Sequence, residues 1–228
     1  MTMRETAPDV GTTADTDAFK GPIGPAMSVA FPTPIVLHDW PDSDTLNTAL
    51  TELILAEEKQ SKGVVKSNVG GWHSGLDFLH RDEPPLRRLL ARVRSMTHAL
   101  IPETMSRPQG AGRLQLGVEG WANILRAGEY NTIHNHPNST WSGVYYVTGN
   151  QPSLSGRTQP FAGKLEFVDP RPGASIGYVD NSKLYGRCMV EPQAGRMVMF
   201  PSWLQHFVHP CAGAGERISI AFNVMIRG

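Results

Sequence analysis

Cysteine is scarce in this chain, and neither sign of charge predominates. The two cysteines, Cys188 and Cys211, form no CxxC motif, so the sequence lacks the framework of a disulfide-stabilised secreted domain. Two reduced thiols suit a cytoplasmic enzyme, and we expect that location. Lys+Arg and Asp+Glu each number 21, which indicates no basic surface for nucleic acid or an anionic membrane. A small-molecule or peptide substrate is therefore favoured, with no nucleic-acid or membrane partner.

Long apolar runs are also missing. The first residues, MTMRETAPDVGTTADTDAF, lack the continuous apolar stretch of a signal peptide, and nowhere do about 18 apolar residues follow one another. We expect a protein that is not exported by that route and does not span a membrane.

The length suffices for one sizeable core. With 228 residues, 40% apolar and 18% charged, the composition is that of a globular protein, and no solenoid-type repeat occurs. Residues 1–25, rich in Thr, Asp, Gly and Pro, predict a flexible N-terminal arm. Residues 26–228 predict a single domain, with helical support over about 43–103 and a β core over about 113–228.

The pattern along the chain predicts helices first and strands afterwards. MSVAFPTPIVLHDW, interrupted by two prolines, predicts a short edge strand over 27–40. Amphipathic helices are predicted over 43–62 and from Pro84 to about 101, each with an apolar stripe suited to packing on a sheet. Five β-type runs follow, LQLGVEGWANIL, WSGVYYVTG, KLEFVDP, GRMVMFPS and RISIAFNVMI. The fold class is α+β, mainly β, built on an antiparallel barrel or sandwich.

Three histidines in the β part have the spacing of metal ligands. His134 and His136 lie in IHNHP just before a predicted strand, and on an extended segment the side chains at i and i+2 share one face. His206 follows GRMVMFPSWLQ. Neutral imidazoles suit Fe(II), Zn(II) and similar ions, and three ligands leave positions open for reactants. Structural or solvated histidines are the alternative interpretation.

One all-β metal architecture, the cupin, matches in part. Its pattern requires glycine, five residues and HxH, and Gly128 stands that far before His134. A second glycine, Gly195, precedes Pro201 by the same interval, with a histidine at the expected distance beyond. However, the glutamate expected after HxH is missing, and Trp203 replaces a glycine. A three-His cupin dioxygenase that needs no co-substrate stays open, as does a non-enzymatic metal-binding β-barrel.

A second architecture, the Fe(II)/2-oxoglutarate oxygenase, also requires a basic residue on the last strand to hold the distal carboxylate of 2-oxoglutarate. Arg217 lies eleven residues beyond His206 in ERISIAFNV, with Ser219 following it. A guanidinium can hold a carboxylate by two parallel hydrogen bonds, and the serine hydroxyl can add a third. Within an apolar strand, an arginine on the face opposite the isoleucines requires an anionic partner. The cupin interpretation gives Arg217 no role.

Three segments, WANILRAGEYNTIHNHPNSTWSGVYYV, PQAGRMVMFPSWLQHFVHP and ERISIAFNV, together resemble the putative 2OG-Fe(II) oxygenase family, which is similar to the prolyl hydroxylases. The resemblance covers roughly residues 113–228. It implies a double-stranded β-helix of the jelly-roll or cupin-like type, and an oxidoreductase that uses Fe(II), 2-oxoglutarate and O₂, with hydroxylation as the usual outcome. It further implies that His134, His136 and His206 bind iron and that Arg217 and Ser219 bind the co-substrate.

The sequence departs from the superfamily at position 136, where a carboxylate is usual and this chain has histidine. A neutral three-His set leaves the metal more cationic, which alters its potential and its attraction for an anionic co-substrate. Asp169 and Asp180 follow in turn-like contexts that argue against a distant carboxylate ligand.

Several further residues are candidates beside the metal. Asn123 and Tyr145 are predicted to point into the barrel and bind 2-oxoglutarate, although buried structural polar residues would look the same. Asn138, Trp72 and Trp203 are candidates for substrate contact, Trp72 as part of a lid formed with His73; turn formation and packing are the alternatives. His209 is interpreted as lying behind the ligands or in solvent. Edge strands would permit a homodimer.

Overall fold

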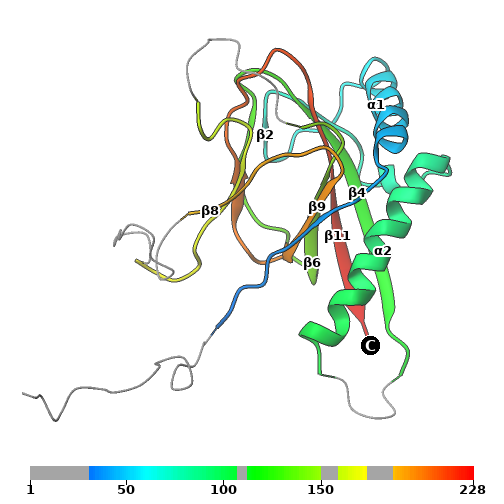
Figure 1. Ribbon diagram of the computed structural model, residues 1–228, viewed down its shortest axis with the longest axis vertical. Coiled ribbons are helices and arrows are strands. Elements are labelled where there is room, and N and C mark those ends of the chain that lie inside the picture. The colour runs from blue at the N-terminus through cyan, green and yellow to red at the C-terminus, as the bar shows by residue number, and fades with distance from the viewer. Residues whose placement is uncertain (1–30, 107–111, 150–158, 174–186) are drawn as a thin grey trace, which may run out of the picture. The chain divides into compact units, whose positions relative to one another are not determined.

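The computed structural model describes residues 31–106, 112–149, 159–173 and 187–228 (Figure 1). The fold below is that of one compact unit, Thr33–Gly228. The predicted arm, residues 1–25, lies outside the described residues, as does Asp180.

Two antiparallel sheets form the β part. The six-stranded sheet has the order β1-β9-β6-β11-β4-β3, with β1 (Val36–Asp39), β9 (Arg196–Pro201), β6 (Trp141–Tyr146), β11 (Arg217–Arg227), β4 (Gln115–Leu125) and β3 (Trp72–His73). The five-stranded sheet has the order β2-β5-β10-β7-β8, with β2 (Asn68–Val69), β5 (Tyr130–His134), β10 (His206–Val208), β7 (Leu165–Phe167) and β8 (Cys188–Val190). From β4 to β11 the chain crosses repeatedly from one sheet to the other, as in a jelly roll. This topology confirms the predicted double-stranded β-helix.

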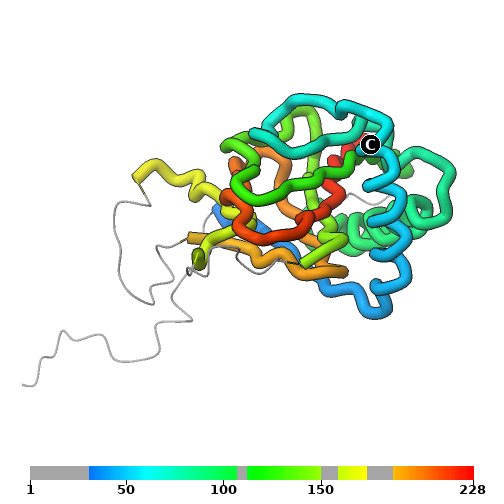
Figure 2. Tube along the Cα trace, turned by 90° about the horizontal axis from the view of Figure 1, so that it is seen from above, coloured from blue at the N-terminus to red at the C-terminus, as the bar shows by residue number. Residues whose placement is uncertain are grey.

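Two helices, α1 (Asp44–Glu58) and α2 (Pro84–Thr104), cover the outer face of the six-stranded sheet (Figures 1 and 2). A short 3₁₀ helix spans Phe78–His80. The apolar stripes of α1 and α2 pack on outward-facing side chains of β11, in a core that includes Leu50, Leu89, Ile220 and Phe222. This arrangement confirms the predicted helical support. No helix within the described ranges combines the length and the apolarity needed to cross a bilayer.

Strand alternation gives the six-stranded sheet a second, inward-facing surface. In β11 the isoleucines at 218 and 220 face the helices, whereas Arg217 and Ser219 face the other sheet and line a cavity between the sheets. A second apolar cluster includes Leu125, Leu165 and Phe200, and the last two also line the cavity. This cavity, lined by both polar and apolar side chains, holds the candidate site.

Strands β1, β4, β6, β7, β9 and β11 lie in runs for which the sequence predicts strands, whereas β5, β8 and β10 lie in segments between the predicted strands. β1 is an edge strand, as its prolines predict. β8 and β10 have only three residues each, too few to show an alternating pattern. Gly128 and Gly195, the two glycines of the cupin-like spacing, have φ angles of 83° and 84° and form turns before β5 and β9.

Candidate metal centre

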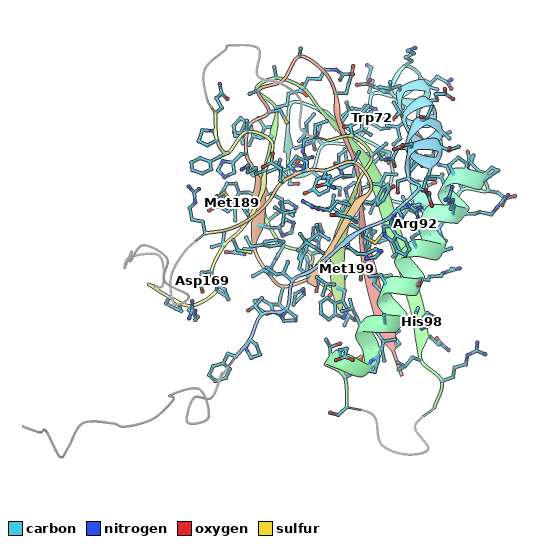
Figure 3. All side chains as sticks on the ribbon, in the orientation of Figure 1. Trp72, Arg92, His98, Asp169, Met189 and Met199 are labelled. Carbon is cyan, nitrogen blue, oxygen red and sulfur yellow. The ribbon has the colours of Figure 1, made fainter. Side chains whose placement is uncertain are left out.

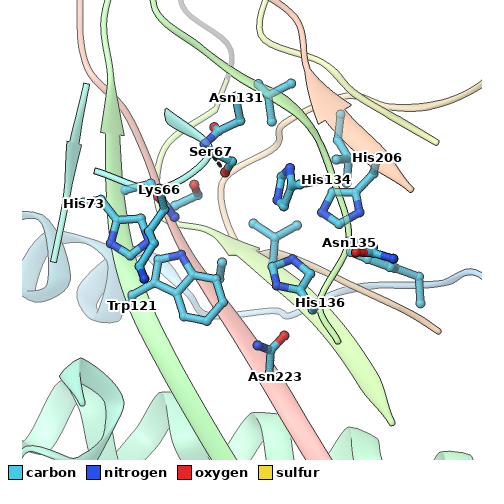
Figure 4. A pocket seen from close by; sticks show the side chains of 18 of the residues that line it. Lys66, Ser67, His73, Trp121, Asn131, His134, Asn135, His136, His206 and Asn223 are labelled. Carbon is cyan, nitrogen blue, oxygen red and sulfur yellow. Dashed lines mark hydrogen bonds between the residues drawn. The ribbon is translucent and has the colours of Figure 1, made fainter. Parts of the chain in front are cut away.

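The three predicted histidines converge in the five-stranded sheet (Figure 4). His134 ends β5, His206 begins β10, and the two lie directly opposite each other in the antiparallel register. His136 follows two residues after His134, and its backbone N–H donates to the Ser202 carbonyl. One ligand nitrogen from each ring lies within 4.8 Å of the other two. The fold thus brings together ligands that are far apart in sequence.

Backbone carbonyls orient two of the rings. Nδ1 of His134 is 2.7 Å from the Thr132 carbonyl oxygen, and Nδ1 of His206 is 2.9 Å from that of Leu204. With a proton on each Nδ1, both Nε2 atoms remain as free acceptors that can bind a metal. Burial lowers the pKa of His134, and it lowers the pKa of His136 to about 4 and that of His206 to about 3. At neutral pH all three rings are therefore uncharged, the form that binds cations.

The donor set fits a divalent transition metal. Imidazole nitrogen binds such an ion at about 2.1 Å, so two ligand atoms on one ion lie about 3–4 Å apart. Separations of up to 4.8 Å need only small ring rotations to reach that spacing. Three nitrogens on one side of the ion leave its other side open to the cavity.

No carboxylate joins this group among the described residues. Asp169 forms a bidentate pair with Arg171 and does not line the cavity. The Nε2 atom of His209 lies 2.7 Å from a Glu166 oxygen, away from the triad. The site at position 136 therefore has an imidazole where the superfamily usually has a carboxylate.

The cavity around the histidines has a volume of about 850 Å³. Its lining residues include Arg217, which is 4% exposed. Nε of Arg217 donates to the Gly163 carbonyl over 3.0 Å, and Nη1 is 3.3 Å from Ser219 Oγ. No carboxylate of the described residues forms an ion pair with it. A buried guanidinium without an anionic partner is costly, so the cavity is suited to an anion.

The prediction for Tyr145 is wrong. Its hydroxyl faces the helices, donates to Asn47 Oδ1 over 2.7 Å and accepts from Arg92 Nη1 over 3.2 Å. Its neighbour Tyr146 lines the cavity instead, with the Arg217 guanidinium 5.1 Å from its ring centroid. The Tyr146 hydroxyl is buried without a hydrogen-bond partner among the described residues, and burial raises its pKa. Sequence alternation did not identify Tyr146 because β6 is buried on both faces.

Of the other predicted co-substrate and substrate residues, some line the cavity and some do not. Asn123 lies opposite Ser219 in the sheet, and both line the cavity, as does Asn138. Trp72 does not line it: its ring lies in the core next to the helices and its Nε1 donates to the Ser61 carbonyl over 2.9 Å (Figure 3). Trp203 is 51% exposed and also lies outside the cavity lining. The predicted lid of Trp72 and His73 is therefore wrong, although His73 itself lines the cavity.

Comparisons with known proteins agree with this geometry. Residues 119–223 match the family described as "Putative 2OG-Fe(II) oxygenase". A search of curated proteins found no significant match.

Solved structures of similar fold include two prolyl hydroxylases and a protein with 2-oxoglutarate bound. A prolyl-4-hydroxylase from Pseudomonas putida has a TM-score of 0.57 and 16% identity, over 85% of this chain and 93% of that one. A prolyl hydroxylase from Trichoplax adhaerens, in complex with a peptide of hypoxia inducible factor, has a TM-score of 0.54 and 15% identity, over 84% and 83%. HygX from Streptomyces hygroscopicus, with nickel, 2-oxoglutarate and hygromycin B bound, has a TM-score of 0.55 and 14% identity, over 85% and 83%.

The matched segment contains the three histidines and Arg217, and the structural likeness extends over most of the chain. Residues 119–223 thus match the putative 2OG-Fe(II) oxygenase family, and the chain shares the fold of the solved structures with which it was compared.

Proposed function

We propose that this protein is an Fe(II)- and 2-oxoglutarate-dependent oxygenase that binds iron through His134, His136 and His206. The observation that carries the assignment is the position of Arg217, a buried guanidinium without an ion pair among the described residues, in the same cavity as three neutral imidazoles. A cation site and an anion site in one cavity match a metal chelated by a dicarboxylic acid.

The cavity supplies the groups that would hold the distal carboxylate of 2-oxoglutarate. Arg217 donates charge-assisted hydrogen bonds, and the hydroxyls of Ser219 and Tyr146 supply further donors. Asn123, opposite Ser219, offers an amide on the same wall. Bound iron and 2-oxoglutarate would supply the oxidising chemistry: O₂ is consumed, 2-oxoglutarate becomes succinate and CO₂, and the substrate gains a hydroxyl group. The chain's own residues orient the reactants and exclude water.

The structure gives Arg217 no task in either alternative function. A three-His cupin dioxygenase without a co-substrate would bury a cation beside its metal for no gain. A non-enzymatic metal-binding barrel would have no use for a second, oppositely charged subsite. Arg217 donates to one carbonyl and one hydroxyl, and neither neutralises it.

The substrate is proposed to be a small molecule or a peptide side chain, with Asn138 beside the metal among its contacts. A balanced net charge supports the absence of a nucleic-acid or membrane partner. Two cysteines without a CxxC motif support a cytoplasmic location. The edge strands β1 and β8 offer surfaces for a homodimer.

The test is an anaerobic titration of the Fe(II)-loaded protein with 2-oxoglutarate, following the visible charge-transfer band that chelation produces. We expect the band in the wild type and a co-substrate affinity lowered by roughly 10- to 150-fold in Arg217→Ala, because a charge-assisted hydrogen bond contributes about 1.5–3 kcal/mol. Arg227→Ala, an exposed arginine on the same strand, is the matched control and should behave as wild type. Absence of the band in the wild type would refute the assignment.

A further inference from the structure

The cavity has a second charged end. Three charged side chains line it among the described residues, namely Arg217, Lys66 and Glu119. Arg217 and Asn223 both face inward from β11, and Glu119 lies directly opposite Asn223 on β4. Six residues of strand separate Arg217 from Asn223, roughly 20 Å at the usual rise per residue. The cavity thus has a cationic end and an anionic end.

The histidines lie between these two ends. Trp121, two residues from Glu119 on β4, is opposite Ala221, and its ring centroid lies 5.6 Å from that of His136. Figure 4 shows His136 between Asn223 on one side and His134 with His206 on the other. If 2-oxoglutarate extends from Arg217 to the metal, the Glu119 end is the space left for the substrate. Glu119 is one inward-facing position beyond Trp121, roughly 7 Å along the strand.

Hydrogen bonds fix the orientation of the Glu119 carboxylate. The Ser142 hydroxyl donates to Asn223 Oδ1 over 2.8 Å, which turns the amide so that Nδ2 donates to Glu119 Oε1 over 2.8 Å. Ser142 and Asn223 are 1% and 5% exposed, so this relay is shielded from bulk water. Oε2 of Glu119 has no hydrogen-bond partner among the residues that the structure describes.

No cation among the described residues neutralises the Glu119 carboxylate. None of the ion pairs among the described residues includes Glu119, and Lys66, the other cation of the lining apart from Arg217, is exposed and pairs with no carboxylate there. A single neutral amide donor leaves most of the charge of Glu119 uncompensated. Trp121 and Leu76 form apolar walls of the cavity near it and can pack against an alkyl chain.

We propose that Glu119, positioned by Asn223 and Ser142, binds a basic nitrogen of the substrate, a primary ammonium or a guanidinium, carried on an alkyl stem that packs on Trp121. This inference rests on the proposed function. Glu119 is a specificity-determining residue, and Asn223 and Ser142 are positioning residues that orient its carboxylate. A neutral substrate would leave a partly buried carboxylate without a counter-charge.

The experiment measures binding to the anaerobic Fe(II)- and 2-oxoglutarate-loaded protein by isothermal titration calorimetry. Nα-acetyl-lysine methylamide is compared with its norleucine analogue, and the arginine compound with its citrulline analogue, so that each pair differs chiefly in charge. n-Butylamine and n-butanol form a third pair that represents a small-molecule source. We expect the basic member of at least one pair to bind about tenfold more tightly, or better. The pair with the largest preference distinguishes a peptide side chain from a free amine.

Glu119→Gln keeps the side-chain size and the acceptor for Asn223 while removing the charge, and it should reduce the preference to about threefold or less. Glu103→Gln, an exposed glutamate near the end of α2, is the matched control and should retain it. Equal binding of charged and neutral probes, a preference that survives in Glu119→Gln, or binding by none of the basic probes overturns the inference. The 2-oxoglutarate band is recorded in the same samples. A band with no charge preference removes only this inference, whereas a missing band removes the proposed function.

Discussion

Tyr145 and Tyr146 are consecutive residues of β6 whose hydroxyls lie on opposite faces of the six-stranded sheet. The first bonds to Asn47 and Arg92 beneath the helices. The second is buried beside Arg217 in the cavity and has no partner among the described residues. The hydroxyl of Tyr145 is therefore structural, whereas that of its neighbour Tyr146 is available to a ligand.

This pair gives a matched test of the co-substrate site. Tyr146→Phe should weaken 2-oxoglutarate binding by about 2- to 12-fold, the value of one hydrogen bond of about 0.5–1.5 kcal/mol. It should not lower the free energy of unfolding of the ligand-free protein, because the deleted hydroxyl makes no hydrogen bond there. Tyr145→Phe should do the reverse, lowering stability by about 1–3 kcal/mol and leaving 2-oxoglutarate affinity unchanged. Co-substrate titration and chemical denaturation measure both effects, and equal effects of the two variants would contradict the assignment.

The metal ligands can be tested against a nearby histidine. His206→Ala should lower Fe(II) affinity by at least about 100-fold, because losing a direct ligand costs more than the 10- to 100-fold typical of losing a residue behind one. His209→Ala removes a ring that hydrogen-bonds to Glu166. This variant should bind Fe(II) as tightly as the wild type does. Competition with a metal-sensitive dye measures both constants. Comparable losses in the two variants would mean that the metal lies elsewhere.

The pH dependence of the metal-free protein follows from burial of the triad. His136 and His206 have folded-state pKa values of about 4 and about 3, below the usual 6.5, so the unfolded chain takes up protons first as pH falls. The stability that these rings contribute is therefore present above pH 6.5 and is lost as pH falls from 6.5 through those values. His206→Gln should flatten the pH dependence of the unfolding free energy between about pH 6.5 and 4. An unchanged slope in His206→Gln would contradict the neutral triad.

The two motif glycines should differ in their response to a methyl group. Both Gly128 and Gly195 have positive φ, which costs an alanine about 1–2 kcal/mol. A Cβ at Gly128 meets nothing within 4 Å, whereas one at Gly195 would lie 3.0 Å from Cβ and Oγ of Ser43. We therefore expect Gly195→Ala to be the more destabilising in thermal or denaturant unfolding. The reverse order would mean that the close approach of Ser43 to Gly195 is not what makes the two positions differ.

The sequence predicted the fold class, the helices and the long strands because those segments carry clear periodicity. The convergence of His134, His136 and His206 was predicted as well, because HxH fixes two side chains on one face whatever the surrounding register. The faces of β6 could not be predicted: WSGVYY is buried on both sides and has no polar alternation to set its phase. The link between Glu119 and Asn223 also escaped prediction, because it exists only once the pairing of β4 with β11 is known.

The direct pairing of His134 with His206 has a mechanical consequence. An ion held by both rings would cross-link β5 to β10, where the register shifts between His206 and Val208 and regular pairing is short. The long β4–β11 ladder needs no such reinforcement. Metal loading should thus slow amide hydrogen exchange in the five-stranded sheet far more than in the six-stranded sheet, so that one half of the barrel owes its rigidity to the cofactor.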